Sequence, residues 1–201
     1  MAFARGIVSH TGLSRKEAVV TNLWASLLGG QVAGLVFAVF LMVVYPIVLG
    51  RSILDPLRIM GALFRGPDVA HNGGAGAIIL GLIANQVVAL LWSLVYWVIS
   101  AFSRERFTLN HAMMLGFIIG GFAVLLDVYA IMPVFQRGVN GVNVWARNVW
   151  PIYDWLAHAA FGLSLGLAFF GFRNQIETTR LCKRGVAHKT TDPSHVHRHE
   201  P

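Results

Sequence analysis

Asp127 is the only acidic residue deep within an apolar stretch of this 201-residue chain, and His158 occupies a similar depth in the next one. A carboxylate in hydrocarbon needs a partner, and an imidazole on an adjacent antiparallel helix can provide one. At about 1.5 Å of rise per residue, both residues lie roughly 10 Å inside the outer membrane boundary. The sequence therefore predicts an intramembrane polar cluster of Asp127 and His158 that also draws on Asn85, Asp154 and His71.

Three interpretations of this cluster remain open. The first is a structural hydrogen-bond network that fixes the register of the helices. The second is a proton-handling site, because histidine titrates near neutral pH and such a site suits a quinone or proton path. The third is a b-type haem held by His71 and His158, since two histidines on different helices can supply both axial ligands.

Other chemistry finds little support in the sequence. His195, His197 and His199 alternate near the C-terminus, and imidazoles suit Cu(II), Ni(II) or Zn(II), but ordering a terminal strand costs entropy, so we expect a solvated tail. Cys182 is the only cysteine, which excludes an intramolecular disulfide and multi-cysteine metal motifs. Neither a P-loop nor a GxSxG, HExxH or CxxCH motif occurs. We therefore expect no enzyme activity and no cofactor of its own in this chain, with bound lipid instead.

The elements that must position these residues are membrane-spanning helices. The chain is 56% hydrophobic and 12% charged, which a soluble domain of this size could not hide. A helix of roughly 20 apolar residues crosses the hydrocarbon core. The sequence thus predicts an all-α membrane protein, a four-transmembrane-helix bundle. The expected spans are about 21–49, 69–101, 108–135 and 151–172, between an N-terminal cytoplasmic segment, 1–20, and a basic, histidine-containing cytoplasmic tail, 173–201.

The distribution of basic residues predicts the orientation. Lys and Arg are concentrated on the side that holds both ends of the chain, so both termini are expected in the cytoplasm of a bacterium, with the spans in its inner membrane. Residues 1–20 lack a long apolar core, and we expect the first span to act as an uncleaved signal anchor. The net charge of +7 then reflects this bias and attraction to anionic lipid, and no nucleic-acid partner is expected.

Small residues recur at intervals of four along the expected spans. Such spacing lets two helix backbones approach closely. In the second span Asn85, Ala89 and Ser93 continue the same stripe, which favours a helix contact face over an ion site. The expected packing residues are Gly30, Gly34, Gly73, Ala77, Gly81, Gly116, Gly120, Gly162 and Gly166. The short turn SRERF predicts that the second and third spans form a tight antiparallel hairpin.

An internal repeat is also visible. Shifting the chain by 87 positions pairs residues that are hard to substitute, glycine, proline and histidine among them. The pairs are Ala25 with Ala112, Leu28 with Leu115, Gly29 with Gly116, Gly34 with Gly121, Pro46 with Pro133, His71 with His158 and Leu80 with Leu167. They predict two tandem helical hairpins related by duplication.

The two outer loops show amphipathic and aromatic patterns. Residues 51–68 place apolar side chains on roughly one face and Arg58 and Arg65 on the other, which is typical of a short helix in the membrane interface or of a docking surface. Trp145, Trp150 and Trp155 are expected to be interfacial anchors.

The order of motifs resembles a known group. A glycine-rich span ends in proline, a D-P-L-R stretch follows, the next span opens with histidine and small residues, and the last one reads HAAFGLSLGLAFFG. Over about residues 20–172 this is similar to the YagU-like small four-helix bacterial inner-membrane proteins of unknown function. The resemblance implies a four-helix membrane bundle and no established activity. Asp127, the Trp-rich second loop and the histidine tail are not features that the group requires.

Three functions follow as expectations. The first is a non-catalytic accessory subunit of a larger membrane complex, such as a respiratory terminal oxidase, with other integral membrane subunits and phospholipids as partners. The alternative is a small transporter or proton-linked carrier that uses His71, His158, Asp127 and Asn85. The third is a b-type haem electron carrier with His71 and His158 as ligands.

Overall fold

The computed structural model describes residues 15–102 and 108–190, which are helical apart from short connections. Four of the helices are long and apolar enough to cross a membrane, at Lys16–Leu49, Ala75–Ala101, Leu109–Val134 and Pro151–Arg180. The prediction of an all-helical chain with four span-length apolar helices is confirmed. In chain order the elements are α1 Arg15–Leu49, α2 Asp55–Arg65, α3 Val69–Asn72, α4 Ala75–Phe102, α5 Leu109–Ala123, the π-helix η1 Val124–Ile131, α6 Met132–Asn140, α7 Val144–Asn148 and α8 Pro151–Thr190.

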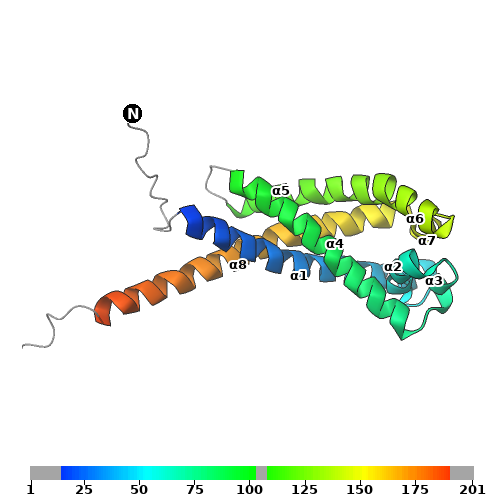
Figure 1. Ribbon diagram of the computed structural model, residues 1–201, viewed down its shortest axis with the longest axis horizontal. Helices are drawn as coiled ribbons and strands as arrows, with labels where there is room; N and C mark the ends of the chain where they lie inside the picture. Colours follow the sequence, from blue (N-terminus) through cyan, green and yellow to red (C-terminus); the bar gives the residue numbers. More distant parts are fainter. Residues whose placement is uncertain (1–14, 103–107, 191–201) are drawn as a thin grey trace, which may run out of the picture.

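The long helices are arranged around a central pair. α1 and α8 pack against each other along much of their length, α4 packs on α1, and α5 packs on α8 (Figure 1). The short elements α2, α3, α6 and α7 gather at one end of the bundle, which we call the loop end, while α1 begins and α8 ends at the opposite end. Both ends of the described chain therefore lie on the same side of the bundle.

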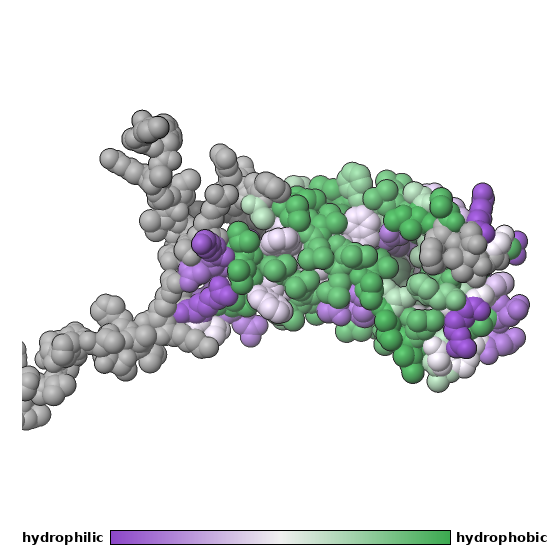
Figure 2. All heavy atoms as spheres, viewed as in Figure 1, coloured by the Kyte–Doolittle hydropathy of each residue, from purple (hydrophilic) through white to green (hydrophobic). Residues whose placement is uncertain are grey.

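The surface agrees with a membrane-embedded bundle. Apolar side chains cover its middle, and hydrophilic side chains gather at both ends (Figure 2). α4 is the most exposed of the four long helices: 17% of its most apolar 18-residue segment is buried, against 39% for the corresponding segment of α8. Because hydrocarbon solvates apolar side chains, this exposed belt is the expected surface of a multi-pass membrane protein.

α4 and α5 follow each other in the chain but make few direct contacts. One bond joins them, from the Tyr96 hydroxyl to the carbonyl oxygen of Ala112 at 3.1 Å. The prediction that these two spans pack as a tight hairpin is therefore wrong. The physical reason is that the small-residue faces of the two helices point to other partners, α1 for α4 and α8 for α5.

The α5–α8 contact brings two backbones together. A Cβ added to Gly116 would overlap the carbonyl oxygen of Gly162, and one added to Gly120 would overlap that of His158. On α8, a Cβ at Gly166 would likewise meet the carbonyl oxygen of Ala112. Only glycine fits at these positions, because any side chain would separate the helices.

The α1–α4 contact uses the same device on a smaller scale. Gly30 faces Ser93, and Gly34 faces Ala89, so each of these two glycines of α1 receives a small side chain from α4. The Asn85 side chain adds a hydrogen bond, its Nδ2 donating to the carbonyl oxygen of Gly34 at 2.8 Å. The part of the α4 stripe from Asn85 to Ser93 therefore packs against α1.

The part of the same stripe that holds Ala77 and Gly81 packs against α2. The carbonyl oxygen of Ala77 lies against Gly61, and the carbonyl oxygen of Leu57 lies against Gly81. Eight of the eleven residues of α2 are buried. The amphipathic helix expected within residues 51–68 is therefore present, but α4 covers its apolar face, so this face is not free to dock a partner; its place in the membrane interface stays a prediction.

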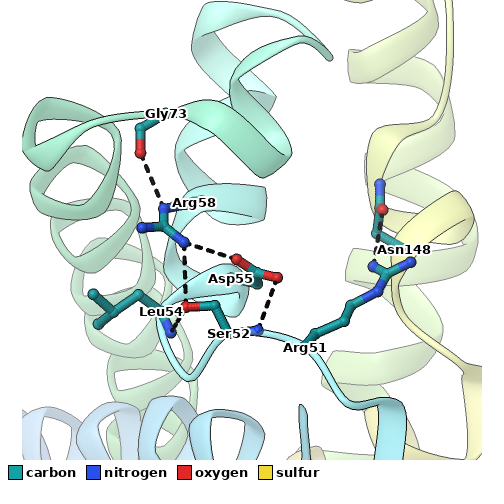
Figure 3. Close-up of polar contacts among 7 residues, drawn as sticks. All are labelled: Arg51, Ser52, Leu54, Asp55, Arg58, Gly73 and Asn148. Atoms are coloured by element: carbon teal, nitrogen blue, oxygen red, sulfur yellow. Dashed lines mark hydrogen bonds and ion pairs between the residues drawn. The ribbon is translucent and has the colours of Figure 1, made fainter. Parts of the chain in front are cut away.

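A polar network fastens α2 to its surroundings at the loop end (Figure 3). Arg58 donates from Nε to the carbonyl oxygen of Gly73 at 3.0 Å and from Nη1 to Asp55 Oδ1 at 2.8 Å. Asp55 Oδ2 accepts from the backbone N–H of Ser52 at 3.3 Å. The D-P-L-R stretch in the sequence therefore ties the start of α2 to the turn that precedes α4.

The end points of two expected spans differ from the structure. The span predicted at 69–101 is two helices, because α3 ends at Asn72 and the pair Gly73 and Gly74 separates it from α4. α8 continues to Thr190, so residues 173–190 of the predicted tail are helical. Arg180 fixes this extension to α1 through a 2.7 Å bond from Nη1 to Thr21 Oγ1.

The pairs of the repeat do not all lie in equivalent surroundings: Gly29 and Gly116 both face the backbone of α8, but other pairs differ. Gly34 packs against Ala89, whereas its counterpart Gly121 has nothing within 4 Å of an added Cβ. His71 is exposed in α3, whereas its counterpart His158 is buried in α8. Duplication therefore stays a prediction.

Candidate intramembrane binding site

A cavity of about 380 Å³ lies between α4 and η1. Its wall takes residues from seven elements, α1, α2, α4, η1, α6, α7 and α8, and most of those side chains are apolar. Three polar residues interrupt the apolar wall: Asn85, Asp127 and His158. The volume falls in the range of small-molecule sites, about 300–1,000 Å³. A smaller hollow of about 40 Å³ shares the same three residues.

Asp127 stands on the π-helix η1, whose wider turn interrupts the α-helical path of the third span. π-helical turns are rare and occur often at functional sites. Asp127 Oδ2 accepts a hydrogen bond from the indole Nε1 of Trp92 on α4, at 2.8 Å. This bond crosses from α4 to η1, between two elements that otherwise leave the cavity open. Trp92 escaped the sequence reasoning, although an indole N–H in mid-span signals a buried acceptor nearby.

His158 is held by the first turn of its own helix. Its Nδ1 lies 2.9 Å from the carbonyl oxygen of Asp154 and 3.1 Å from Asp154 Oδ1. Both neighbours are acceptors, so Nδ1 is the nitrogen that carries hydrogen. The ring of Phe37 meets the imidazole edge to face, with centroids 4.9 Å apart. The orientation of His158 is therefore fixed from two sides.

Asp154 connects this histidine to the loop end. Its carboxylate is 2% exposed, and Oδ2 accepts from the Trp145 indole Nε1 at 2.9 Å. Trp145 is itself 4% exposed, so the expectation of an interfacial anchor is wrong for this residue, whose indole serves a buried carboxylate instead. Trp150 and Trp155 do lie on the surface.

Gln136 is a further residue that the sequence reasoning missed. Its side chain is fully buried, and Oε1 accepts from the backbone N–H of Trp145 at 3.1 Å. This bond holds α7 against the end of the third span. No spacing pattern marked Gln136, because it lies beyond the expected end of the apolar stretch.

The structure brings together part of the predicted cluster. Asn85, Asp127 and His158 line one cavity, and Asp154 lies directly behind His158. Asp127 and His158 are not directly bonded among the described contacts, so Trp92 is the partner of the carboxylate in place of the expected imidazole. His71 is exposed on α3 and lines neither hollow, so the two histidines expected as haem ligands do not line one cavity; the haem interpretation stays a prediction.

Metal ligation has no visible centre in the described segments, where no group of three or more His, Cys, Asp or Glu side chains could hold an ion. His195, His197 and His199 fall outside the described residues. Any metal-binding role of the tail therefore stays untested.

Neither a family model, a curated protein nor a solved structure matches this chain. The fold and the site alone define its class: an all-helical protein with four span-length apolar helices and a cavity of small-molecule size beside a π-helix. The likeness to the YagU-like group stays a prediction from sequence motifs.

Proposed function

We propose that the protein is a small, non-catalytic membrane carrier that binds an amphipathic molecule in the cavity between α4 and η1. The observation that carries this proposal is that Asn85, Asp127 and His158, from three different helices, all line that one cavity. A carrier needs such convergence, since polar groups in hydrocarbon are costly unless they meet a substrate or each other. Of the four residues expected in a carrier, three line the cavity, and His71 is exposed on α3 instead.

Access from the lipid supports the same proposal. Ile83, Val87 and Val88 line the cavity and are also exposed on the outer surface of α4. The cavity wall is therefore continuous with the lipid-facing surface, and an apolar molecule can approach from the hydrocarbon. In the proposed orientation, with both termini cytoplasmic in a bacterial inner membrane, the cavity belongs to the outer half of the bilayer.

Filling the cavity tests the proposal. Met60 lies on the cavity wall and is nearly fully buried, so Met60→Trp places a large ring into the space. Native mass spectrometry of the gently solubilised wild-type chain is expected to show a retained small molecule, and Met60→Trp to lose it. Binding is the step that a carrier requires of this chain alone.

Met114→Trp is the matched control, because Met114 is 58% exposed on α5 and is not part of the cavity wall. It is expected to retain the molecule at the wild-type level. Identical spectra for wild type and Met60→Trp would contradict the carrier proposal.

An accessory subunit of a respiratory or other membrane complex is the second candidate. What supports it is the outer side of α4, the least buried of the four long helices, which offers room for other integral membrane subunits. The small-residue rows no longer support it, because they are occupied within the chain. Extraction of a tagged chain from its native membrane in mild detergent is expected, on this proposal, to yield larger polypeptides in fixed stoichiometry; a partner-free chain would rule it out.

A further inference from the structure

Three polar atoms on the cavity wall are hydrogen-bond acceptors without a protein partner among the described contacts, beside the second N–H of the Asn85 amide. Asn85 Nδ2 is committed to the carbonyl oxygen of Gly34, so Oδ1 remains. Asp127 Oδ2 is committed to Trp92, so Oδ1 remains. His158 Nδ1 carries its hydrogen toward Asp154, and the neutral ring then offers Nε2 as an acceptor. All three remaining atoms accept hydrogen bonds.

The charge of the cavity points the same way. Among the residues that the structure describes, Asp127 is the one acidic residue on the cavity wall, and neither lysine nor arginine lines it. The ion pairs found within the described ranges join Arg58 with Asp55, His158 with Asp154 and Arg173 with Glu177, and none involves Asp127. A carboxylate at this depth is stabilised by a cation. The protein itself supplies a single N–H, from Trp92.

The other side chains of the cavity wall indicate the chemical character of the rest of the bound molecule. Phe37, Phe64 and Trp145 contribute aromatic rings, which attract a cation through their faces. The other side chains around the three acceptors are aliphatic or methionine. A fitting molecule therefore has one positively charged, hydrogen-donating group and an otherwise apolar body.

We propose that the substrate class of this site is a hydrophobic amine, whose protonated amino group lies among Asn85, Asp127 and His158 while its apolar body occupies the rest of the cavity. This inference rests on the proposed carrier function and names its substrate. A neutral amphiphile with a hydroxyl donor would meet the three acceptors but would bring no counter-charge to an ionised Asp127.

Three probes of one shape test the inference on the full chain in nanodiscs of phosphatidylcholine. They are 4-phenylbutylamine, its trimethylammonium analogue and 4-phenylbutanol, each measured by equilibrium binding with empty nanodiscs subtracted. The amine is expected to bind saturably and most tightly. The trimethylammonium analogue lacks N–H donors and the alcohol lacks the charge, so each is expected to bind roughly tenfold more weakly or worse, as for a lost hydrogen bond to a charged group.

Asp127→Asn is the matched variant, because an amide keeps an acceptor oxygen for Trp92 and removes the charge. It is expected to lower the affinity for the amine roughly tenfold to a hundredfold. Asp68→Asn, exposed at the loop end, is expected to change nothing. Because the three-probe comparison uses the wild-type chain, it decides the question even if the Asp127 variant does not fold.

The two proposals fail in different ways. Equal binding of the amine and the alcohol, or an unchanged amine affinity in Asp127→Asn, would overturn the hydrophobic-amine inference. The carrier function would still stand if the native wild-type chain retained a different small molecule that Met60→Trp lost. If the wild-type chain neither bound the amine nor retained a small molecule that Met60→Trp loses, the carrier function and the hydrophobic-amine inference would both be overturned.

Discussion

Gly116→Leu is expected to abolish the folded bundle. At this position the backbones of α5 and α8 are in direct contact, and any Cβ would overlap the carbonyl oxygen of Gly162. Overpacking a core typically costs about 1–3 kcal/mol when neighbouring side chains can move. Here the obstacle is backbone, so the helices themselves must separate. We expect the loss to reach the upper end of that range or beyond, at least about 3 kcal/mol.

The measurement is the yield of monodisperse protein after detergent extraction, together with its thermal unfolding. Gly121→Leu is the matched control, since Gly121 lies five residues away on the same helix with nothing within 4 Å of an added Cβ. It should fold like the wild type, because leucine favours both helix and lipid. A Gly116→Leu protein as stable as Gly121→Leu would show that α5 and α8 do not touch as described.

The fold was predictable as far as the membrane constrains it. In hydrocarbon the backbone must satisfy its own hydrogen bonds, so long apolar stretches are helices, and the four spans follow from length and composition. A row of small residues shows that some backbone lies close without showing which one. The stripe from Gly73 to Ser93 illustrates this limit. Ala77 and Gly81 pack against α2, whereas Ala89 and Ser93 pack against α1.

Two features of the long helices differ from the prediction: the π-helix had no clear sequence signal, and the length of α8 had a signal that the prediction did not use. The segment Val124–Ile131 is apolar except for Asp127, and its π-helical turn has no marker in hydrophobic periodicity. The extension of α8 did have a marker. Arg173 and Glu177 stand four apart and pair at 3.0 Å, a spacing that supports a helix even in polar sequence.

The position of the candidate site could be predicted from the sequence better than the hydrogen-bond partners of its residues. Counting residues from the span ends placed Asp127 and His158 at one depth, and both line the same cavity. Asp127 and His158 do not bond each other but other groups, which the sequence did not reveal because Trp145 was interpreted as an interfacial anchor and Trp92 was not considered. Trp92 and Trp145 instead use their N–H groups on the two buried carboxylates, Asp127 and Asp154. A tryptophan has an apolar ring and one obligatory donor, and only the tertiary structure shows which of them governs its place.

Asp154→Ala is expected to destabilise the protein by about 1–3 kcal/mol, since it leaves the buried Trp145 indole without its acceptor and removes one of the two oxygens beside His158 Nδ1. Asp68→Ala, an acidic residue exposed at the loop end, is the control and should be neutral.

A double-mutant cycle with Trp145→Phe separates the bond from the loss of side-chain volume. Phenylalanine removes the N–H donor and keeps most of the ring, so Trp145→Phe alone leaves Asp154 Oδ2 without that bond. In the double variant neither group is left unpaired by the other, and the two effects should fall short of their sum by about 0.5–3 kcal/mol. Thermal or denaturant unfolding of the four proteins in one detergent measures this difference. Additive effects would mean that Trp145 and Asp154 contribute separately, and His158 would then be oriented by the Asp154 carbonyl oxygen and the ring of Phe37, without a contribution from α7.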